Sequence, residues 1–275
     1  MLLFVVFTAG PIISSLYMSL TDIKSRDLRS PFAVGFVGLE NYAHILGDSS
    51  FRQSAYDTAY FVIIGVPLTL GIALAAAMAL DKGITRFRTL FRVGYYTPVV
   101  TSIVAVAVVW RFLLRQDVGL FNTILGWVGI HGPDWLGSTT WAMPSLIAMA
   151  SWRNFGTAMI IFLAGLQSVP VMLQEAAAID GASSWQRFRH ITLPLLRPTM
   201  LFVMVTTTIG YVQFFEEPFV MTNGGPLDST KSMSMFTYEQ FGFGNYGFAS
   251  AAGYVLFVII VALSAMQFRF FRSNT

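Results

Sequence analysis

Charged residues inside long apolar stretches are the first candidates for chemistry in this sequence. Arg153 lies in the middle of one stretch, beside Asn154, and Glu216 and Glu217 lie toward the end of another. Ionisable residues at membrane depth are costly, and they usually face the interior of a helix bundle or a water-filled cavity. Two interpretations follow. Either Arg153 forms an internal ion pair with Glu217, or these side chains line a polar path for a solute.

Polar and aromatic residues next to the two glutamates favour the second interpretation. Sugar hydroxyls need groups that donate and accept hydrogen bonds, and the apolar face of a sugar ring stacks on aromatic side chains. Phe214 taken alone is equally compatible with simple packing. On a continuous helix Glu216 is expected to point about 100° away from Glu217, outside the path. The predicted pathway residues are Arg153, Asn154, Tyr211, Gln213, Phe214 and Glu217.

The segment 169–197 is too long for a simple connection between antiparallel helices, and it contains residues that typically start and end helices. Residues 174–178 favour a helix, and Gly181 supplies a stop in the left-handed conformation. Ser183, three residues before Gln186, predicts a capping box that opens a second helix. The sequence therefore predicts two short helices that display charged and aromatic groups. The alternative is an amphipathic hairpin on the membrane surface, although such helices usually concentrate Lys and Arg on their polar face.

Catalytic and cofactor-binding motifs are missing from the sequence. There is no cysteine and no G-x-x-x-x-G-K-[ST] motif, so neither thiolate chemistry nor a P-loop is expected in this chain. Residues 242–247 match G-x-G-x-x-G, but no strand precedes them, and we expect a flexible loop there. His44, His131 and His190 are too scattered to predict a metal site. We expect no catalytic residues, no metal and no nucleic-acid partner.

Composition shows what must position these residues. The 275-residue chain is 55% hydrophobic and only 11% charged, whereas a soluble domain is about 25% charged. A helix that crosses a membrane needs about 20 apolar residues, and six stretches qualify. The first could instead be a cleaved signal peptide, but it lacks a basic start and a cleavage site, and we interpret it as a span whose preceding cytoplasmic tail is missing. We predict one all-α membrane domain over 1–275, with spans at about 1–20, 54–80, 93–110, 139–167, 198–221 and 247–268.

Basic residues predict the orientation of these spans. Positive charge favours the cytoplasmic side of a membrane protein. Six spans place both termini on the same side, and this side receives the basic loop after Asp81 and the segment 169–197. The opposite loops are also partly basic, but their charges are diluted by acids and length. We therefore predict cytoplasmic termini; the basic residues of the first loop are Lys82, Arg86, Arg88 and Arg92.

The segment 169–197 closely resembles the "EAA loop" of binding-protein-dependent ABC importer permeases. The resemblance rests on Glu175-Ala176-Ala177, Asp180-Gly181-Ala182 and Ile191-Thr192-Leu193-Pro194, which keep the spacing of that family. It points to the carbohydrate-uptake branch, similar to maltose, trehalose and glycerol-phosphate permeases. Further matching segments, which extend the resemblance over most of the chain, are 36–42, 152–156, 163–167 and 223–226.

The resemblance implies a function and a set of partners. The chain would be a multi-pass permease of a bacterial inner (plasma) membrane that transports a sugar or related polyol. It would pair with a second homologous permease, two ATP-binding subunits and an extracytoplasmic solute-binding protein, which would dock near the loop 22–51. ATP and Mg²⁺ would be bound by the ATPase subunits, and this chain would hold no cofactor. The alternative is a self-sufficient secondary transporter, which would often show internal repeats. The residues implied in coupling to the ATPase are Glu175, Ala176, Ala177, Asp180, Gly181 and Ala182.

Overall fold

The computed structural model describes the whole chain except residues 31–33, 83–87 and 273–275. Within this part, the predicted all-α class is confirmed, because the chain forms helices and turns with one isolated antiparallel bridge between Thr21 and Phe36. The α-helices are α1 (Leu2–Phe4), α2 (Gly10–Ser19), α3 (Glu40–Gly47), α4 (Ser49–Lys82), α5 (Arg88–Val100), α6 (Ile103–Leu113), α7 (Leu120–Trp127), α8 (Ala142–Gln167), α9 (Val171–Ile179), α10 (Ser184–Arg187), α11 (Leu193–Leu195), α12 (Arg197–Val212), α13 (Glu216–Met221), α14 (Met233–Gly242) and α15 (Tyr246–Arg272). Short π-helical segments at Val5–Ala9 and Phe188–Thr192 join α1 to α2 and α10 to α11.

Membrane-spanning helices are identified by their length and apolar composition. Within the described residues, three helices qualify, and they are Ser49–Asp81 of α4, the whole of α8, and Tyr246–Phe271 of α15. Two bent pairs, α5 with α6 and Ser184–Leu195 with α12, raise the number to five if each pair is one span. Val5–Ser19, in the first predicted span, is a shorter apolar helix. The count of six spans therefore stays a prediction.

The third predicted span, 93–110, is not one continuous helix. The described chain turns by 103° between the end of α5 and the start of α6. Pro98 removes a backbone donor from the last turn of α5, and Ser102, with φ of −54° and ψ of 125°, leaves the helical conformation. The expectation of a single helix over this range was wrong.

The fifth predicted span, 198–221, is broken as well. The helix α12 ends at Val212, and Phe215 adopts a non-helical conformation (φ −143°, ψ −48°) before α13 begins. A helix through Pro218 would press its ring against the carbonyl of Phe214, four residues earlier, so the chain leaves the helix before that position. Because of this break, Glu216 and Glu217 belong to α13 and not to α12.

Glycines set the distances between the helices around the molecule's centre, where α4 and α8 pack most extensively. A Cβ at Gly156 of α8 would lie 2.2 Å from the Tyr95 carbonyl oxygen of α5. At Gly65 of α4 a Cβ would lie 2.8 Å from Cε2 of Tyr211, which belongs to α12. Only glycine permits these close approaches, so both positions hold neighbouring helices at their observed spacing.

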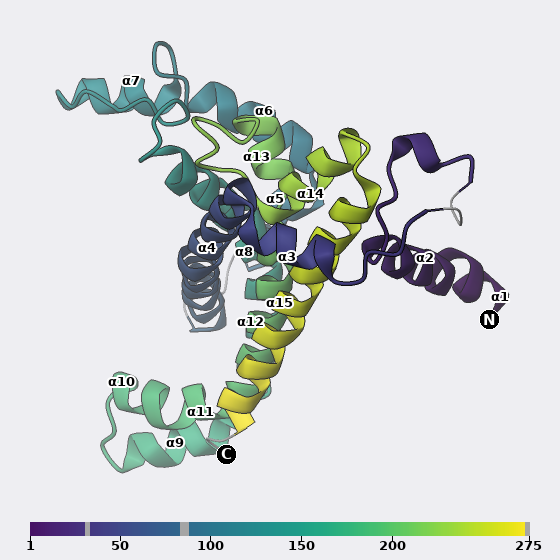
Figure 1. Ribbon diagram of the computed structural model, residues 1–275. Coiled ribbons are helices and arrows are strands. Elements are labelled where there is room, and N and C mark those ends of the chain that lie inside the picture. Colours follow the sequence, from purple (N-terminus) through teal and green to yellow (C-terminus); the bar gives the residue numbers. More distant parts are fainter. Residues whose placement is uncertain (31–33, 83–87, 273–275) are drawn as a thin grey trace.

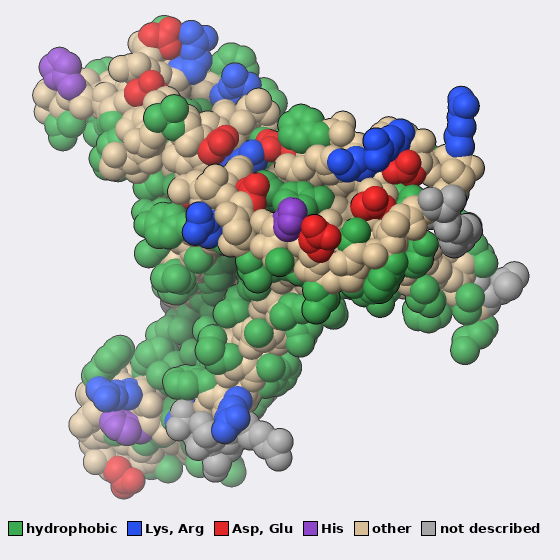
Figure 2. Space-filling view, in the orientation of Figure 1, with side chains coloured by type: hydrophobic (Ala, Val, Ile, Leu, Met, Phe, Trp, Pro, Cys, Tyr) green, Lys and Arg blue, Asp and Glu red, His purple; other side chains and the backbone are tan. Residues whose placement is uncertain are grey.

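The molecule has two distinct ends joined by long helices (Figure 1). The helices α9 to α11 and the C-terminal end lie at one end, and α6, α7, α13 and α14 lie toward the other. Figure 2 shows hydrophobic side chains across the middle and charged side chains mainly toward the two ends. This distribution suits a bilayer, whose core is apolar and whose borders are polar. The basic loop predicted after Asp81 lies largely outside the described residues, and the orientation stays a prediction.

The glycine-rich segment 242–247 contains the last residue of α14, a three-residue turn and the first two residues of α15. The Phe243 amide donates to the Glu239 carbonyl oxygen (2.8 Å), and the Asn245 amide donates to the Gln240 carbonyl oxygen (3.0 Å). Gly244 takes a positive φ of 77°. The expectation of a flexible loop was wrong because α14 and α15 lie close together and leave only a short connection.

Candidate functional site

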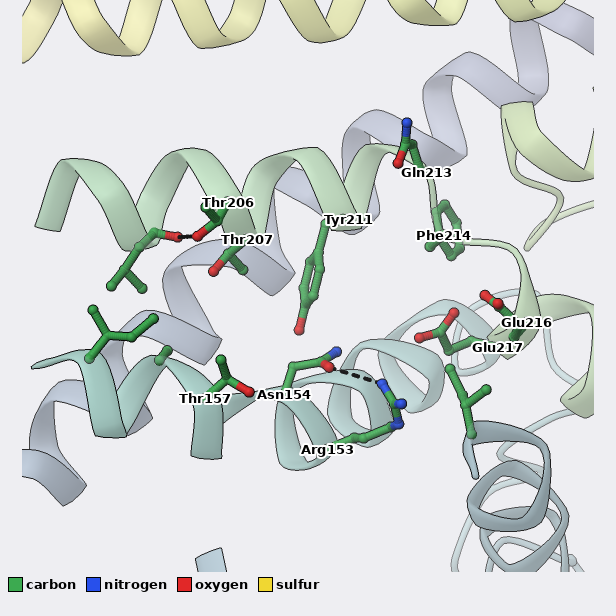
Figure 3. A pocket seen from close by; sticks show the side chains of 15 residues that line it. Arg153, Asn154, Thr157, Thr206, Thr207, Tyr211, Gln213, Phe214, Glu216 and Glu217 are labelled. Atoms are coloured by element: carbon green, nitrogen blue, oxygen red, sulfur yellow. Dashed lines mark hydrogen bonds between the residues drawn. The ribbon is translucent and has the colours of Figure 1, made fainter. Parts of the chain in front are cut away.

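A cavity of about 360 Å³ lies between α8, α12 and α13 (Figure 3). The helix α8 contributes Arg153, Asn154 and Thr157, and α12 contributes residues up to Tyr211. The broken segment after α12 and the start of α13 close the remaining side. All six predicted pathway residues line this cavity, although they come from segments about fifty residues apart. The polar or ionisable lining residues are Arg153, Asn154, Thr157, Thr206, Thr207, Tyr211, Gln213, Glu216 and Glu217.

Arg153 and Glu217 face this cavity without forming the ion pair that was one of the two predictions. Nη1 of Arg153 donates to Oδ1 of Asn154 at 3.1 Å, and its buried Nε has no hydrogen-bond partner. Glu217 is only 5% exposed, and none of the ion pairs found among the described residues, with a limit of 4.0 Å, includes it. The break before α13 explains the separation, because Glu217 no longer follows the axis of α12. The Arg153 guanidinium therefore has donor capacity that the described chain leaves unused.

Tyr211 forms a fixed wall of the cavity. Its hydroxyl lies 2.7 Å from Oγ1 of Thr69 on α4, and Thr69 donates to Oγ of Ser151 on α8 at 3.0 Å. Its ring lies directly against Gly65. Figure 3 shows the side chain reaching from α12 toward α8. The tyrosine thus connects three helices, and its position is set by hydrogen bonding as well as by packing.

Phe214 combines packing with exposure to the cavity. The side chain is buried, and its ring stacks on Phe61 of α4 with centroids 3.9 Å apart and an interplanar angle of 4°. It also lines the cavity, next to Gln213. Packing is thus confirmed for Phe214, and its role in the solute path stays a prediction.

Four polar lining residues were not predicted. Thr157 follows Arg153 by four residues, and Thr207 precedes Tyr211 by four, so helical periodicity could have found both. Thr206 and Glu216 show no such signal. Glu216 was expected to point away from the site, but it lines the same cavity as Glu217. The expectation assumed a continuous helix, and both glutamates instead begin a new one.

The arrangement offers hydrogen bonding of both kinds beside apolar surface. Threonine and tyrosine hydroxyls donate and accept, an arginine and two amides donate, and two carboxylates accept. Aromatic rings border the same space. No cluster of three or more metal-binding side chains occurs in the described part of the chain. The lining therefore suits a neutral or weakly charged solute rich in hydroxyl groups.

The second predicted site forms a hairpin, which we define as residues 171–195. Its first helix, α9, ends at Ile179 with Asp180 as the C-cap, and Gly181 has a φ of 81°. The Ala182 amide donates to the Ala177 carbonyl oxygen (2.9 Å), which closes the turn. The predicted capping box is confirmed, since the Ser183 amide donates to Oε1 of Gln186 (2.7 Å) and the Gln186 amide to Oγ of Ser183 (3.3 Å).

The hairpin lies at one end of the molecule and exposes apolar side chains (Figure 1). Met172 is 77% exposed, Ile179 87% and Trp185 66%. Exposed apolar groups that gather on one feature mark a contact surface. The six residues predicted for coupling lie here, and none of them is buried: Glu175, Ala176, Ala177, Asp180, Gly181 and Ala182.

Sequence comparisons relate most of the chain to known transport proteins. Residues 65–273 match the family model described as "Binding-protein-dependent transport system inner membrane component". The chain is 38% identical to the probable ABC transporter permease protein YesP of Bacillus subtilis, over 97% of this chain and 85% of that protein. It is 35% identical to the lactose transport system permease protein LacF of Rhizobium radiobacter, over 96% of this chain and 88% of that protein.

A structural comparison agrees at the level of the fold. A chain in the crystal structure of a bacterial ABC transporter involved in import of the acidic polysaccharide alginate superposes with a TM-score of 0.82 at 23% identity. The superposition covers 100% of this chain and 92% of that chain. The helix breaks and the protruding hairpin thus occur within an overall arrangement that a solved structure shares.

Proposed function

Since the chain belongs to the family of binding-protein-dependent transport system inner membrane components, we infer that it is a permease subunit of an ABC importer for a sugar or related polyol. Family membership over most of the chain favours this function over the self-sufficient secondary transporter. The observation that carries the solute class is the cavity lined by Arg153, Tyr211 and Glu217, where hydroxyl-binding groups adjoin aromatic rings.

The cavity is proposed as this subunit's part of the solute path. The unpartnered Nε of Arg153 and the carboxylates of Glu216 and Glu217 supply hydrogen-bonding capacity for hydroxyl groups. Phe214 and Tyr211 supply apolar surface. Because a hydrogen bond to Thr69 of α4 and packing against Gly65 hold Tyr211, the wall it forms is ready before solute arrives, and little ordering is required on binding.

The partners follow from the family and from the exposed surfaces. A solute-binding protein delivers the solute, and a second permease completes the path. ATP and Mg²⁺ are bound by two ATPase subunits, since this chain has no P-loop. The hairpin docks on one of them through Met172, Ile179 and Trp185, and the carboxylates of Glu175 and Asp180 supply polar contacts. Closure of the ATPases then moves the hairpin and, with it, α12, which exposes the cavity alternately to each side.

Coupling is tested in the complete importer, reconstituted in proteoliposomes. Gly181→Val and Glu175→Lys are each expected to lower solute uptake at least tenfold while ATP hydrolysis continues. Gly129→Val is a matched control, because Gly129 also has a positive φ (75°) and no atom within 4 Å of an added Cβ, but lies far from the hairpin in sequence. Normal uptake in both hairpin variants would show that the hairpin does not couple transport to hydrolysis.

The solute class is tested with the same proteoliposomes. Uptake is measured for a panel of neutral sugars, polyols and glycerol phosphates, each presented with the importer's own binding protein. We expect uptake of at least one compound rich in hydroxyl groups, and lower uptake of that compound at sub-saturating concentration in Glu217→Gln. Transport restricted to amino acids or peptides would contradict the proposal.

A further inference from the structure

A groove of about 650 Å³ lies where α12 begins and α15 ends, away from the cavity described above. Pro198 and Leu201 of α12 form one wall, and Phe268 and Phe271 of α15 form the other. Arg197 and Arg269 both line it. The groove thus joins an apolar floor to two cationic side chains at the end of a membrane helix.

The ionisable side chains among the described lining residues of this groove are basic. Its lining includes two arginines and no aspartate or glutamate. The helix α12 starts at this groove, and its first residue, Arg197, carries one of the two positive charges. Arginine also matches the geometry of phosphate oxygens through two parallel hydrogen bonds.

The apolar side of the groove indicates that the bound anion carries an apolar group. Phe268 is 55% exposed, and Val261 and Phe257, which helical periodicity places on the same face of α15, are also exposed. Such a surface on a membrane helix faces acyl chains. Figure 2 shows basic side chains near the C-terminal end of the molecule, bordered by hydrophobic ones. Basic pockets between helix ends bind the headgroups of anionic lipids.

We propose that this groove binds an anionic phospholipid, with the headgroup phosphate between Arg197 and Arg269 and an acyl chain against Leu201 and Phe268. The site rests on the chain being a membrane protein and is independent of which solute is imported. The helix α12 connects the hairpin to the solute cavity. A lipid bound at the start of α12 would therefore contact the segment through which movement of the hairpin is transmitted to the membrane helices.

Native mass spectrometry of the assembled importer tests the proposal. The complex is titrated with phosphatidylglycerol and, in parallel, with phosphatidylcholine of the same acyl chains. We expect tighter binding of phosphatidylglycerol, a loss of about fivefold in Arg269→Gln, and a loss of about twentyfold when Arg197→Gln is added. Arg269→Lys keeps the charge and is expected to retain most of the binding. Arg111→Gln, an exposed arginine at the end of α6, is the control and is expected to change nothing.

Two further measurements distinguish a bound phospholipid from other ligands of the groove. Leu201→Trp fills the apolar side and is expected to weaken phosphatidylglycerol binding while leaving both arginines in place. Inorganic phosphate is expected to compete poorly, because it lacks acyl chains. Equal binding of the two lipids, or unchanged binding in the double arginine variant, would each overturn the proposal. Both readouts are independent of sugar uptake, so they are informative even if the proposed solute is wrong.

Discussion

At the scale of single residues, the charged groups in the apolar stretches retain hydrogen-bonding capacity that the described chain does not use. Nη1 of Arg153 donates a hydrogen bond to Asn154, and the buried Nε of Arg153 has no hydrogen-bond partner. Glu217 is buried and has no cation within ion-pair distance in the described part of the chain. A buried polar group without a partner costs free energy. A solute that accepts a hydrogen bond from this Nε would remove that cost, which is why we assign Arg153 to binding; Glu217 is assigned by its place in the cavity lining.

The absence of a direct contact makes a prediction about two substitutions. Arg153→Gln and Glu217→Gln should each raise the solute concentration needed for half-maximal uptake about tenfold, since each removes one charged hydrogen-bonding group. The double variant should be impaired at least as strongly as either single variant, because no direct contact between the two side chains lets one loss offset the other. Uptake kinetics in proteoliposomes measure this. Partial recovery in the double variant would show that the two side chains form an ion pair in the membrane, as one sequence interpretation held.

At the scale of helices, close approaches at glycine and breaks near proline position the cavity. Gly65 lets the Tyr211 ring lie against α4, and the break that Pro218 imposes moves two glutamates onto α13. Each feature is local in the sequence, but its effect depends on a helix far away along the chain. The cavity therefore depends on irregularities in helices as much as on the residues that line it.

Substitutions at two glycines of α4 should act in opposite directions. In Gly65→Ala the added Cβ would lie 2.8 Å from Tyr211, and overpacking of this kind costs about 1–3 kcal/mol. Gly71→Ala is the matched control, because nothing lies within 4 Å of its Cβ and alanine favours a helix by about 0.5–1 kcal/mol. Thermal unfolding of the detergent-purified complex should show a lower Tm for the first variant and an unchanged or higher one for the second. Equal Tm values would mean that Tyr211 moves aside without cost.

The capping box of the hairpin makes a third prediction. Ser183→Ala removes the acceptor for the Gln186 amide, and the loss of such a cap costs about 1 kcal/mol. Hydrogen exchange of the α10 amides should accelerate about fivefold, while exchange in α9 changes little. Ser184→Ala is the control, since Ser184 follows the cap and does not accept from the first turn's amides. Equal acceleration in both variants would show that the cap does not hold α10.

At the scale of the whole molecule, the exposed surfaces show that the chain functions within a membrane and an assembly. Hydrophobic side chains cover its middle, where lipid or a second permease would contact them, and the hairpin carries exposed apolar groups at one end (Figures 1 and 2). A soluble monomer rarely exposes so much contiguous apolar surface. The two ends also carry different features, the hairpin at one and the α13–α14 region at the other, as a directional transporter requires.

The native absence of cysteine makes the orientation of these ends directly testable. A cysteine at Ser183, which is exposed on the hairpin, should be protected from an impermeant thiol reagent added outside sealed cells. A cysteine at Leu227, which is 91% exposed at the opposite end, should react. After permeabilisation both should be labelled, which serves as the control for accessibility. Labelling at Ser183 alone in sealed cells would reverse the orientation predicted from the basic loops.

The sequence by itself determined those features that depend on neighbouring residues. Apolar runs identified the membrane class, and Gly181 with Ser183 and Gln186 predicted the hairpin's turn and cap, because such signals act within a few residues through backbone hydrogen bonds. The pathway residues could be chosen as a set because charge at membrane depth is rare. The sequence could predict that these residues line the cavity, but not how their side chains are arranged in it.

Only the tertiary structure decided how these elements meet. The turn between α5 and α6, the shift of Glu216 into the cavity, the separation of Arg153 from Glu217 and the groove between Arg197 and Arg269 all depend on packing between segments far apart in sequence. A proline signals that a helix can break, but the direction of the chain after the break is set by the helices against which it packs. Periodicity within one helix contains no information about that direction.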